Sequence, residues 1–242
     1  RQEGEVIRIL ERINDTIVGT LQRSKHFFYV VADDPRFVHN LCVPPPGPEL
    51  PAQIGDKVVV QLDVWTSRHV APEGHLTEVL GPADAPGVDI LSIIKKHRLP
   101  LELPEVVVRE AEAISRVIDP AEIARREDLR DRMIMTIDPD DAKDFDDAIE
   151  VQRTANGWEV GVHIADVSYY VRPQSALDKE ALIRGNSVYL ADRVIPMLPE
   201  ALSNGICSLR PDEDRLTFSV FAEIGKNGKI LSTRFARTVI RS

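Results

Sequence analysis

The 242-residue sequence predicts a β-rich α/β protein in three parts: an OB-fold-like barrel over residues 1–82, a helical connector over 83–132 and the N-terminal part of a mixed α/β domain over 133–242. Short apolar runs separated by turn residues support the barrel, and apolar runs of helical period support the connector. Two Asn-Gly pairs, Asn156-Gly157 and Asn227-Gly228, predict β-hairpins in the third part.

The first part reads as a series of short strands, which we expect at residues 5–10, 16–22, 27–32, 37–43, 57–64 and 75–80. The proline-rich stretch 44–48 has few backbone donors and must be a loop. Five or six short strands joined by Gly/Pro-rich connections are typical of a small barrel such as the OB-fold.

An aromatic run in this barrel, Phe27-Phe28-Tyr29, follows the basic residues Arg23, Lys25 and His26. Basic and aromatic side chains together can contact the phosphates and stack on the bases of a single nucleic-acid strand. Because alternate strand residues point inward, at least one phenylalanine belongs to the core. We predict that Phe27 or Tyr29 is exposed and contacts substrate.

Three helices are expected in the connector. Asp89 can cap a helix over residues 90–98, Pro104 can open a second that ends near residue 116, and Asp119-Pro120 can start a third. In the third, arginines alternate with acidic residues, which predicts a solvated, ion-paired face.

The most informative stretch is residues 138–147, which hold six aspartates. The apolar run 133–137 predicts a strand that ends at Asp138, since Pro139 cannot continue a ladder, and 148–152 predicts a second strand. Carboxylates crowded at strand ends repel one another unless a cation neutralises them, and an all-carboxylate site suits Mg²⁺ or Mn²⁺.

Two simpler interpretations compete with a metal site. A solvated acidic loop is the common fate of a charge run, although Ala142, Phe145 and Ala148 are interleaved with the acids and favour a packed loop. A calcium loop of the EF-hand type does not fit, because the sixth position from Asp138 is Lys143 and the twelfth is Ile149.

The acidic spacing resembles a known family motif. Asp138, five residues, Asp144, one residue and Asp146-Asp147-Ala148 match the RNB catalytic domain of the RNase II/RNase R exoribonucleases, and the first third resembles the second cold-shock domain of the RNase R branch. Further motifs follow in the family's order: His163-Ile164-Ala165-Asp166-Val167, Leu177-Asp178, Ile195-Pro196-Met197-Leu198-Pro199, Leu202-Ser203-Asn204-Gly205, Cys207-Ser208-Leu209 and Asp214-Arg215-Leu216.

The resemblance implies a Mg²⁺-dependent 3′→5′ exoribonuclease that hydrolyses single-stranded RNA to nucleoside 5′-monophosphates. Asp138, Asp144 and Asp147 are the first choices as Mg²⁺ ligands, with Mn²⁺ a possible substitute, and Asp146 would position the attacking water or a second ion. Asp146 and Asp147 are thus the expected catalytic residues. An aromatic of the family that packs on RNA near its 3′ end corresponds to Tyr189, although Tyr189 as a strand residue could instead turn its ring into the core.

The family's later Ser-Pro-Ile-Arg-type segment and its S1-type RNA-binding domain have no counterpart here, so we expect a fragment of a longer protein. The alternative function is therefore a catalytically inactive RNA-binding or interaction module. A hydrolase of DNA or of small phosphodiesters is a third hypothesis, which activity without a 2′-hydroxyl would reveal.

Composition adds limits. The net charge is −9, but residues 138–150 alone carry −6, so bulk acidity says little against RNA binding. Two cysteines without a CxxC pattern argue against a zinc site or a disulfide framework. No run approaches about 18 apolar residues and no signal peptide opens the chain, which predicts a cytoplasmic, non-membrane protein.

The sequence leaves two interpretations of His163 open: a histidine of the core, or a neighbour of the metal site.

Overall fold

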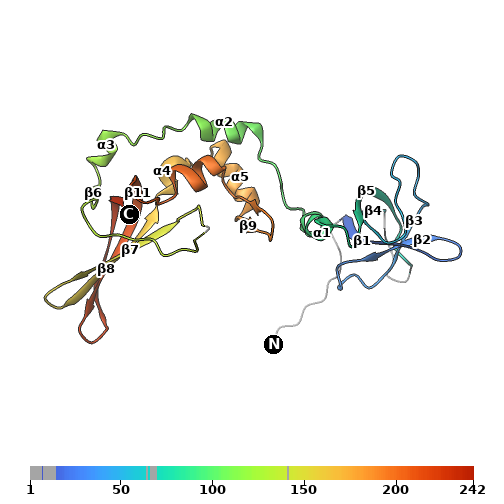
Figure 1. Cartoon of the computed structure of the whole chain (residues 1–242), viewed down its shortest axis with the longest axis horizontal. Coiled ribbons are helices and arrows are strands. Elements are labelled where there is room, and N and C mark those ends of the chain that lie inside the picture. The colour runs from blue at the N-terminus through green and yellow to red at the C-terminus, as the bar shows by residue number, and fades with distance from the viewer. Residues whose placement is uncertain (1–6, 8–14, 64, 66–69, 141) are drawn as a thin grey trace. The chain divides into compact units, whose positions relative to one another are not determined.

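The computed structural model describes residues 7, 15–63, 65, 70–140 and 142–242, and the chain forms two compact units, Arg1–Leu99 and Pro100–Ser242 (Figure 1). Each unit has its own apolar core. The strand predicted at residues 5–10 lies almost wholly outside the described residues. Among the residues described, no helix is both long and apolar enough to cross a membrane.

The first unit is an antiparallel five-stranded sheet in the order β3-β2-β1-β4-β5. Its strands are β1 (Thr16–Arg23), β2 (Phe28–Ala32), β3 (Leu41–Val43), β4 (Asp56–Leu62) and β5 (Gly74–Pro82). A parallel bridge between Cys42 and Glu73 joins the two edges, so the sheet closes on itself. Leu21, Val30 and Val58 are fully buried inside. The predicted small barrel is confirmed.

Helix α1 (Val88–His97) belongs to this first unit and packs on β1, β4 and β5. Burial of Val88 and Ile94 holds it there. The predicted cap at Asp89 is wrong: Gly87, at φ 83°, is the N-cap, because the helix starts earlier and Asp89 already lies in its first turn. The remaining two predicted connector helices lie in the second unit.

The second unit is built on a five-stranded sheet in the order β6-β12-β11-β8-β7, antiparallel except for the β6–β12 pair. The strands are β6 (Glu127–Asp128), β7 (Asp147–Arg153), β8 (Gly157–Ala165), β11 (Asp214–Gly225) and β12 (Ile230–Arg241). Both Asn-Gly hairpins are confirmed, β7 with β8 and β11 with β12. Gly228 has φ 77°, a left-handed conformation that suits glycine.

Helices and a short ribbon complete this unit: α2 (Glu105–Ala113), α3 (Pro120–Ile123), α4 (Val167–Tyr170), α5 (Ala176–Arg184), the π-helix η1 (Ala201–Ile206), and the paired strands β9 (Val188–Tyr189) and β10 (Val194–Ile195). Its core joins sheet residues Ala148, Phe221 and Ile240 to helix residues Leu177 and Leu202. The apolar face of the sheet thus supports the helical layer that carries the candidate site.

Two sequence predictions about this unit are wrong. Residues 133–137 do not form a strand: Met135 makes one isolated bridge to Ile149, and Met133 is 83% exposed. The face expected to be solvated and ion-paired after Asp119 is not solvated at Arg126: this side chain pairs with Glu122 at 2.8 Å but is only 1% exposed. Its Nη2 donates to Asp166 Oδ2 at 2.7 Å, because the turn after α3 packs against the ends of β8 and β11.

Candidate active site

The acidic loop before β7 is fastened by its backbone. Ala165 N–H donates to the Asp146 carbonyl at 3.0 Å. On the other side, the buried Ser208 hydroxyl donates to the Lys143 carbonyl at 2.8 Å and accepts from Phe145 N–H at 3.1 Å. Residues 143–146 are therefore held between β8 and the turn after η1, and their side chains start from fixed positions.

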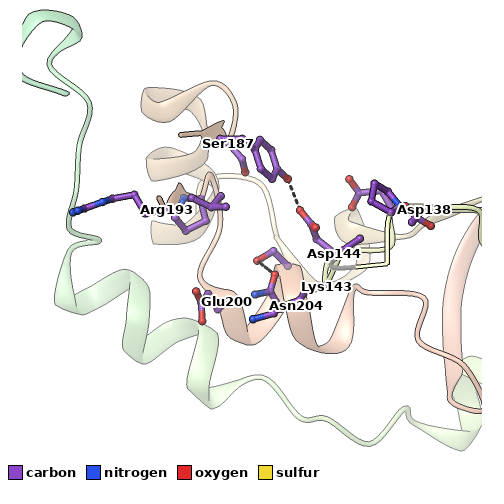
Figure 2. Close-up of a pocket in the computed structure, with 14 residues that line it drawn as sticks. Asp138, Lys143, Asp144, Ser187, Arg193, Glu200 and Asn204 are labelled. Atoms are coloured by element: carbon purple, nitrogen blue, oxygen red, sulfur yellow. Dashed lines mark hydrogen bonds between the residues drawn. The ribbon is translucent and has the colours of Figure 1, made fainter. Parts of the chain in front are cut away.

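A cavity of about 750 Å³ opens beside this loop (Figure 2). The loop, the β9–β10 ribbon and the segment around η1 line it, with Asp138, Pro139, Ala142, Lys143, Asp144, Asp146, Ser187, Tyr189, Arg193, Val194, Pro196, Glu200, Ser203 and Asn204. Three of the four predicted aspartate ligands thus share one cavity. The fourth, Asp147, lies outside the lining with an exposed side chain at the start of β7.

Asp146 is close enough to the other three aspartates to be affected by their charges. Its pKa is raised, first by partial burial and then by the negative charges of Asp144, Asp147 and Asp138. Asp147 therefore acts on this site through its charge although it does not line the cavity. Such mutual repulsion is what a bound cation would relieve.

Tyr189 joins the acidic cluster directly. Its hydroxyl donates a hydrogen bond to Asp144 Oδ2, drawn in Figure 2 as the dashed line that ends at Asp144. That bond, with some burial and the charges of Asp144 and Asp146, raises the pKa of Tyr189 to about 12. The residue is 64% exposed, so its ring is not in the core and is available to a ligand in the cavity.

The donor chemistry of this loop fits a divalent cation, since carboxylate oxygens are the ligands that Mg²⁺ and Mn²⁺ prefer. The present side-chain positions do not converge: within the described part of the chain, no three Asp, Glu, His or Cys side chains form a ready coordination group. Asp144 is turned toward Tyr189 instead.

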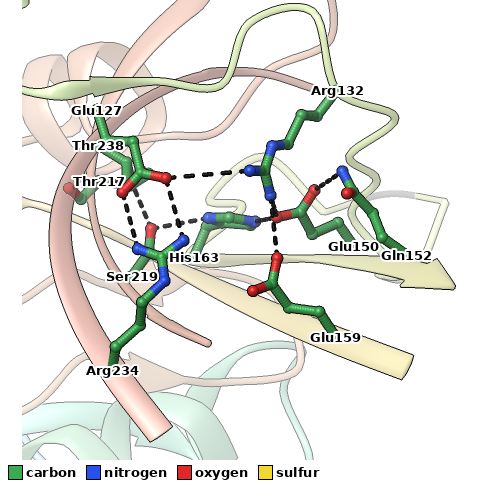
Figure 3. Close-up of polar contacts among 10 residues, drawn as sticks. All are labelled: Glu127, Arg132, Glu150, Gln152, Glu159, His163, Thr217, Ser219, Arg234 and Thr238. Carbon is green, nitrogen blue, oxygen red and sulfur yellow. Dashed lines mark hydrogen bonds and ion pairs between the residues drawn. The ribbon is translucent and has the colours of Figure 1, made fainter. Parts of the chain in front are cut away.

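His163 is fully buried and does not line the cavity. Figure 3 shows the polar side chains around its ring. Its Nδ1 is 2.7 Å from Ser219 Oγ, and its ring meets the edge of Phe221. Burial and the positive charge of Arg132 lower the pKa of His163 to about 4. The core interpretation of this histidine is the correct one, and Arg132 pairs with Glu150 above it at 2.8 Å.

In the barrel, Phe27 is 52% exposed and Tyr29 is half-buried, with ring centroids 5.9 Å apart. Phe28 packs against the core, as strand alternation requires. Phe27 and Tyr29 belong to a different unit from the acidic cavity. The contacts predicted for Phe27, Tyr29 and Tyr189 with substrate stay predictions.

The structure adds lining residues that sequence reasoning had given no role. Asn204 belongs to the Leu202-Ser203-Asn204-Gly205 motif, and this motif was the only feature of the sequence that pointed to a role for Asn204. Lys143 and Arg193 supply positive charge to an otherwise acidic cavity, and no local pattern marks Arg193. Their position follows from the packing of the ribbon and η1 around the loop.

Two known protein families match the two parts of this chain. A family model for the RNB domain matches residues 126–242, and one for the cold shock domain matches residues 29–104. This chain belongs to the RNase II/RNase R family. The family match covers the acidic loop, the β9–β10 ribbon and η1, so the whole cavity lies within the RNB domain.

Relatives in this family match nearly the whole chain. It is 47% identical to Ribonuclease R of Thermotoga maritima over 99% of its length and 34% of that protein. With Ribonuclease R of Vibrio parahaemolyticus it is 42% identical over 100% of this chain and 29% of that one. The chain thus spans about a third of the curated relatives it matches.

Solved structures of RNase R share the fold. The structure of Mycoplasma genitalium RNase R in complex with ribose methylated single-stranded RNA has a TM-score of 0.81 and 32% identity to this chain. The match covers 100% of this chain and 39% of that one.

Proposed function

We propose that this chain is the part of a Mg²⁺-dependent 3′→5′ exoribonuclease that holds the hydrolytic centre, acting on single-stranded RNA and releasing nucleoside 5′-monophosphates. One observation carries the proposal: Asp138, Asp144 and Asp146 line one cavity, where partial burial and the charges of three neighbouring aspartates raise the pKa of Asp146. The ribose methylated single-stranded RNA bound to the Mycoplasma genitalium enzyme supports RNA as the polymer.

In this proposal Asp138, Asp144 and Asp147 hold the divalent cation, with Mn²⁺ able to replace Mg²⁺. A divalent cation held there would supply Lewis-acid chemistry: it would lower the pKa of a bound water and offset negative charge on the scissile phosphate. Asp146 orients the attacking water or holds a second ion, for which its central position among the carboxylates is suited. Tyr189 offers its exposed ring to the terminal base or sugar, and Phe27 and Tyr29 offer aromatic surface on the barrel.

The test compares Asp146→Asn with Asp140→Asn. Asp140 is an exposed acid of the same loop that does not line the cavity, so it controls for charge and position. Both are placed in a chimera in which these 242 residues replace the matching segment of the Thermotoga maritima relative. With Mg²⁺ and labelled single-stranded RNA, D146N should lose activity by on the order of 10²-fold or more, and D140N should not.

Loss of folding does not account for the expected result. Asp146→Asn removes a charge that its neighbours oppose, so its thermal midpoint should not fall. Equal activity of D146N and the unchanged chimera would defeat the assignment. If the unchanged chimera binds the RNA and never degrades it, the rival function, an inactive RNA-binding module, is the correct one.

A further inference from the structure

A second cavity of about 530 Å³ adjoins the acidic one within the same unit. Lys143, Glu200 and Asn204 line both, so these three side chains form the shared wall. All three are labelled in Figure 2 among the residues that line the acidic cavity. The volume falls within the range of about 300–1,000 Å³ that is usual for small-molecule sites.

The lining of the second cavity is basic. Arg116, Lys143, Arg210 and Arg215 stand against two acids, Glu200 and Glu213. Arg215 has a structural role, because its guanidinium pairs with Glu213 and donates to the Ser208 carbonyl at 2.6 Å.

The other three cations are exposed, and their charged groups make no hydrogen bond or ion pair to any side chain in the described part of the chain. Glu200 is the one acid left against them among the described lining residues. The second cavity therefore presents a net positive charge directly beside the acidic cavity that Asp138, Asp144 and Asp146 line.

A basic cavity next to an acidic one favours the movement of anions out of the acidic cavity and into the basic one. Hydrolysis that releases a nucleoside 5′-monophosphate converts a phosphodiester of charge −1 into a monoester of nearly −2. Such a product is repelled by Asp138, Asp144 and Asp146 and attracted across Lys143. A doubly charged monoester gains more from three free cations than a diester does.

We propose that this basic cavity is a subsite for the phosphate group of a nucleoside 5′-monophosphate, through which the cleaved nucleotide leaves. The inference rests on the proposed function for the origin of the ligand, but binding itself needs neither cleavage nor metal.

The experiment titrates the ¹⁵N-labelled 242-residue chain in EDTA with 5′-AMP, adenosine and a triadenylate whose 5′ end is a hydroxyl. Only 5′-AMP should shift the amides of Gly205 and Ile206, which line the cavity, in a saturable way. The double variant Arg116→Ala/Arg210→Ala should raise the Kd for 5′-AMP by about tenfold. Arg153→Ala, an exposed arginine outside both cavities, is the matched control and should leave the Kd unchanged.

Two results would overturn the proposal: a Kd for 5′-AMP that R116A/R210A leaves unchanged, or binding of triadenylate at Gly205 as tight as that of 5′-AMP, which would make the cavity a site for the RNA backbone. Either result leaves the hydrolytic assignment untouched, because that depends on the activity of D146N. Conversely, an inactive chimera that still binds 5′-AMP through Arg116 and Arg210 would defeat the hydrolytic function alone.

Discussion

Replacing His163 should remove most of the stability loss that the second unit undergoes between pH 7 and pH 5. His163 is fully buried, and its pKa is lowered to about 4 from an ordinary 6.5 by burial first and by Arg132 second. The folded state therefore resists a proton that the unfolded state accepts below pH 6.5. Stability is fully present above that pH and falls as the pH drops toward 4.

The magnitude follows from the two pKa values. A difference of one pKa unit between the folded and unfolded states corresponds to about 1.4 kcal/mol, so the full effect is about 3 kcal/mol. Between pH 7 and pH 5 the loss amounts to about 2 kcal/mol of unfolding free energy. His163 is the only histidine in residues 100–242, so no other imidazole of this unit contributes.

The variants are His163→Phe and His163→Gln, neither of which takes up a proton. Their neighbours stay paired, since Ser219 Oγ keeps Thr238 Oγ1 at 2.5 Å and Glu150 keeps Arg132 at 2.8 Å. Phenylalanine is larger and lowers absolute stability at every pH, but the pH slope is the quantity that matters.

Urea denaturation at pH 7, 6 and 5 measures how the free energy of unfolding changes with pH. The experiment uses a Trp65→Phe background, so that the fluorescence of Trp158 reports the second unit alone. The unchanged protein should lose about 2 kcal/mol more than either variant across this range. Replacing the exposed His97 in α1 should alter nothing in the second unit. If the slopes of H163F, H163Q and the unchanged protein coincide, then burial does not keep His163 neutral.

Two further predictions concern buried groups. Arg126→Met leaves the buried Asp166 carboxylate without its cationic partner at 2.7 Å, and should cost about 3–5 kcal/mol in urea denaturation. Asp166→Asn should cost less, because Arg126 Nε still pairs with Glu122 Oε1 at 2.8 Å. Removing both should cost less than the sum of the two, and additive losses would contradict coupling. Burial raises the pKa of Cys207 to about 12, so a thiol reagent at pH 8 should label the half-buried Cys42 first and Cys207 only on unfolding. Equal labelling rates in the folded protein would show that Cys207 is accessible.

Features that depend on neighbouring residues were predictable from the sequence. Asn156-Gly157 and Asn227-Gly228 set hairpin turns through backbone geometry that few other residues accept, and both hairpins form. Closely spaced apolar runs predicted the barrel, and aspartate spacing predicted a shared acidic site that the cavity brings together in three of its four members.

Features that depend on distant partners were decided by the tertiary structure alone. Arg126 is buried because Asp166, 40 residues away, lies where β8 ends. Tyr189 meets Asp144 across 45 residues because the β9–β10 ribbon packs beside the loop. A long side chain can satisfy its charge in water or in the core with similar local sequence, and only the packing of whole elements determines which environment it meets.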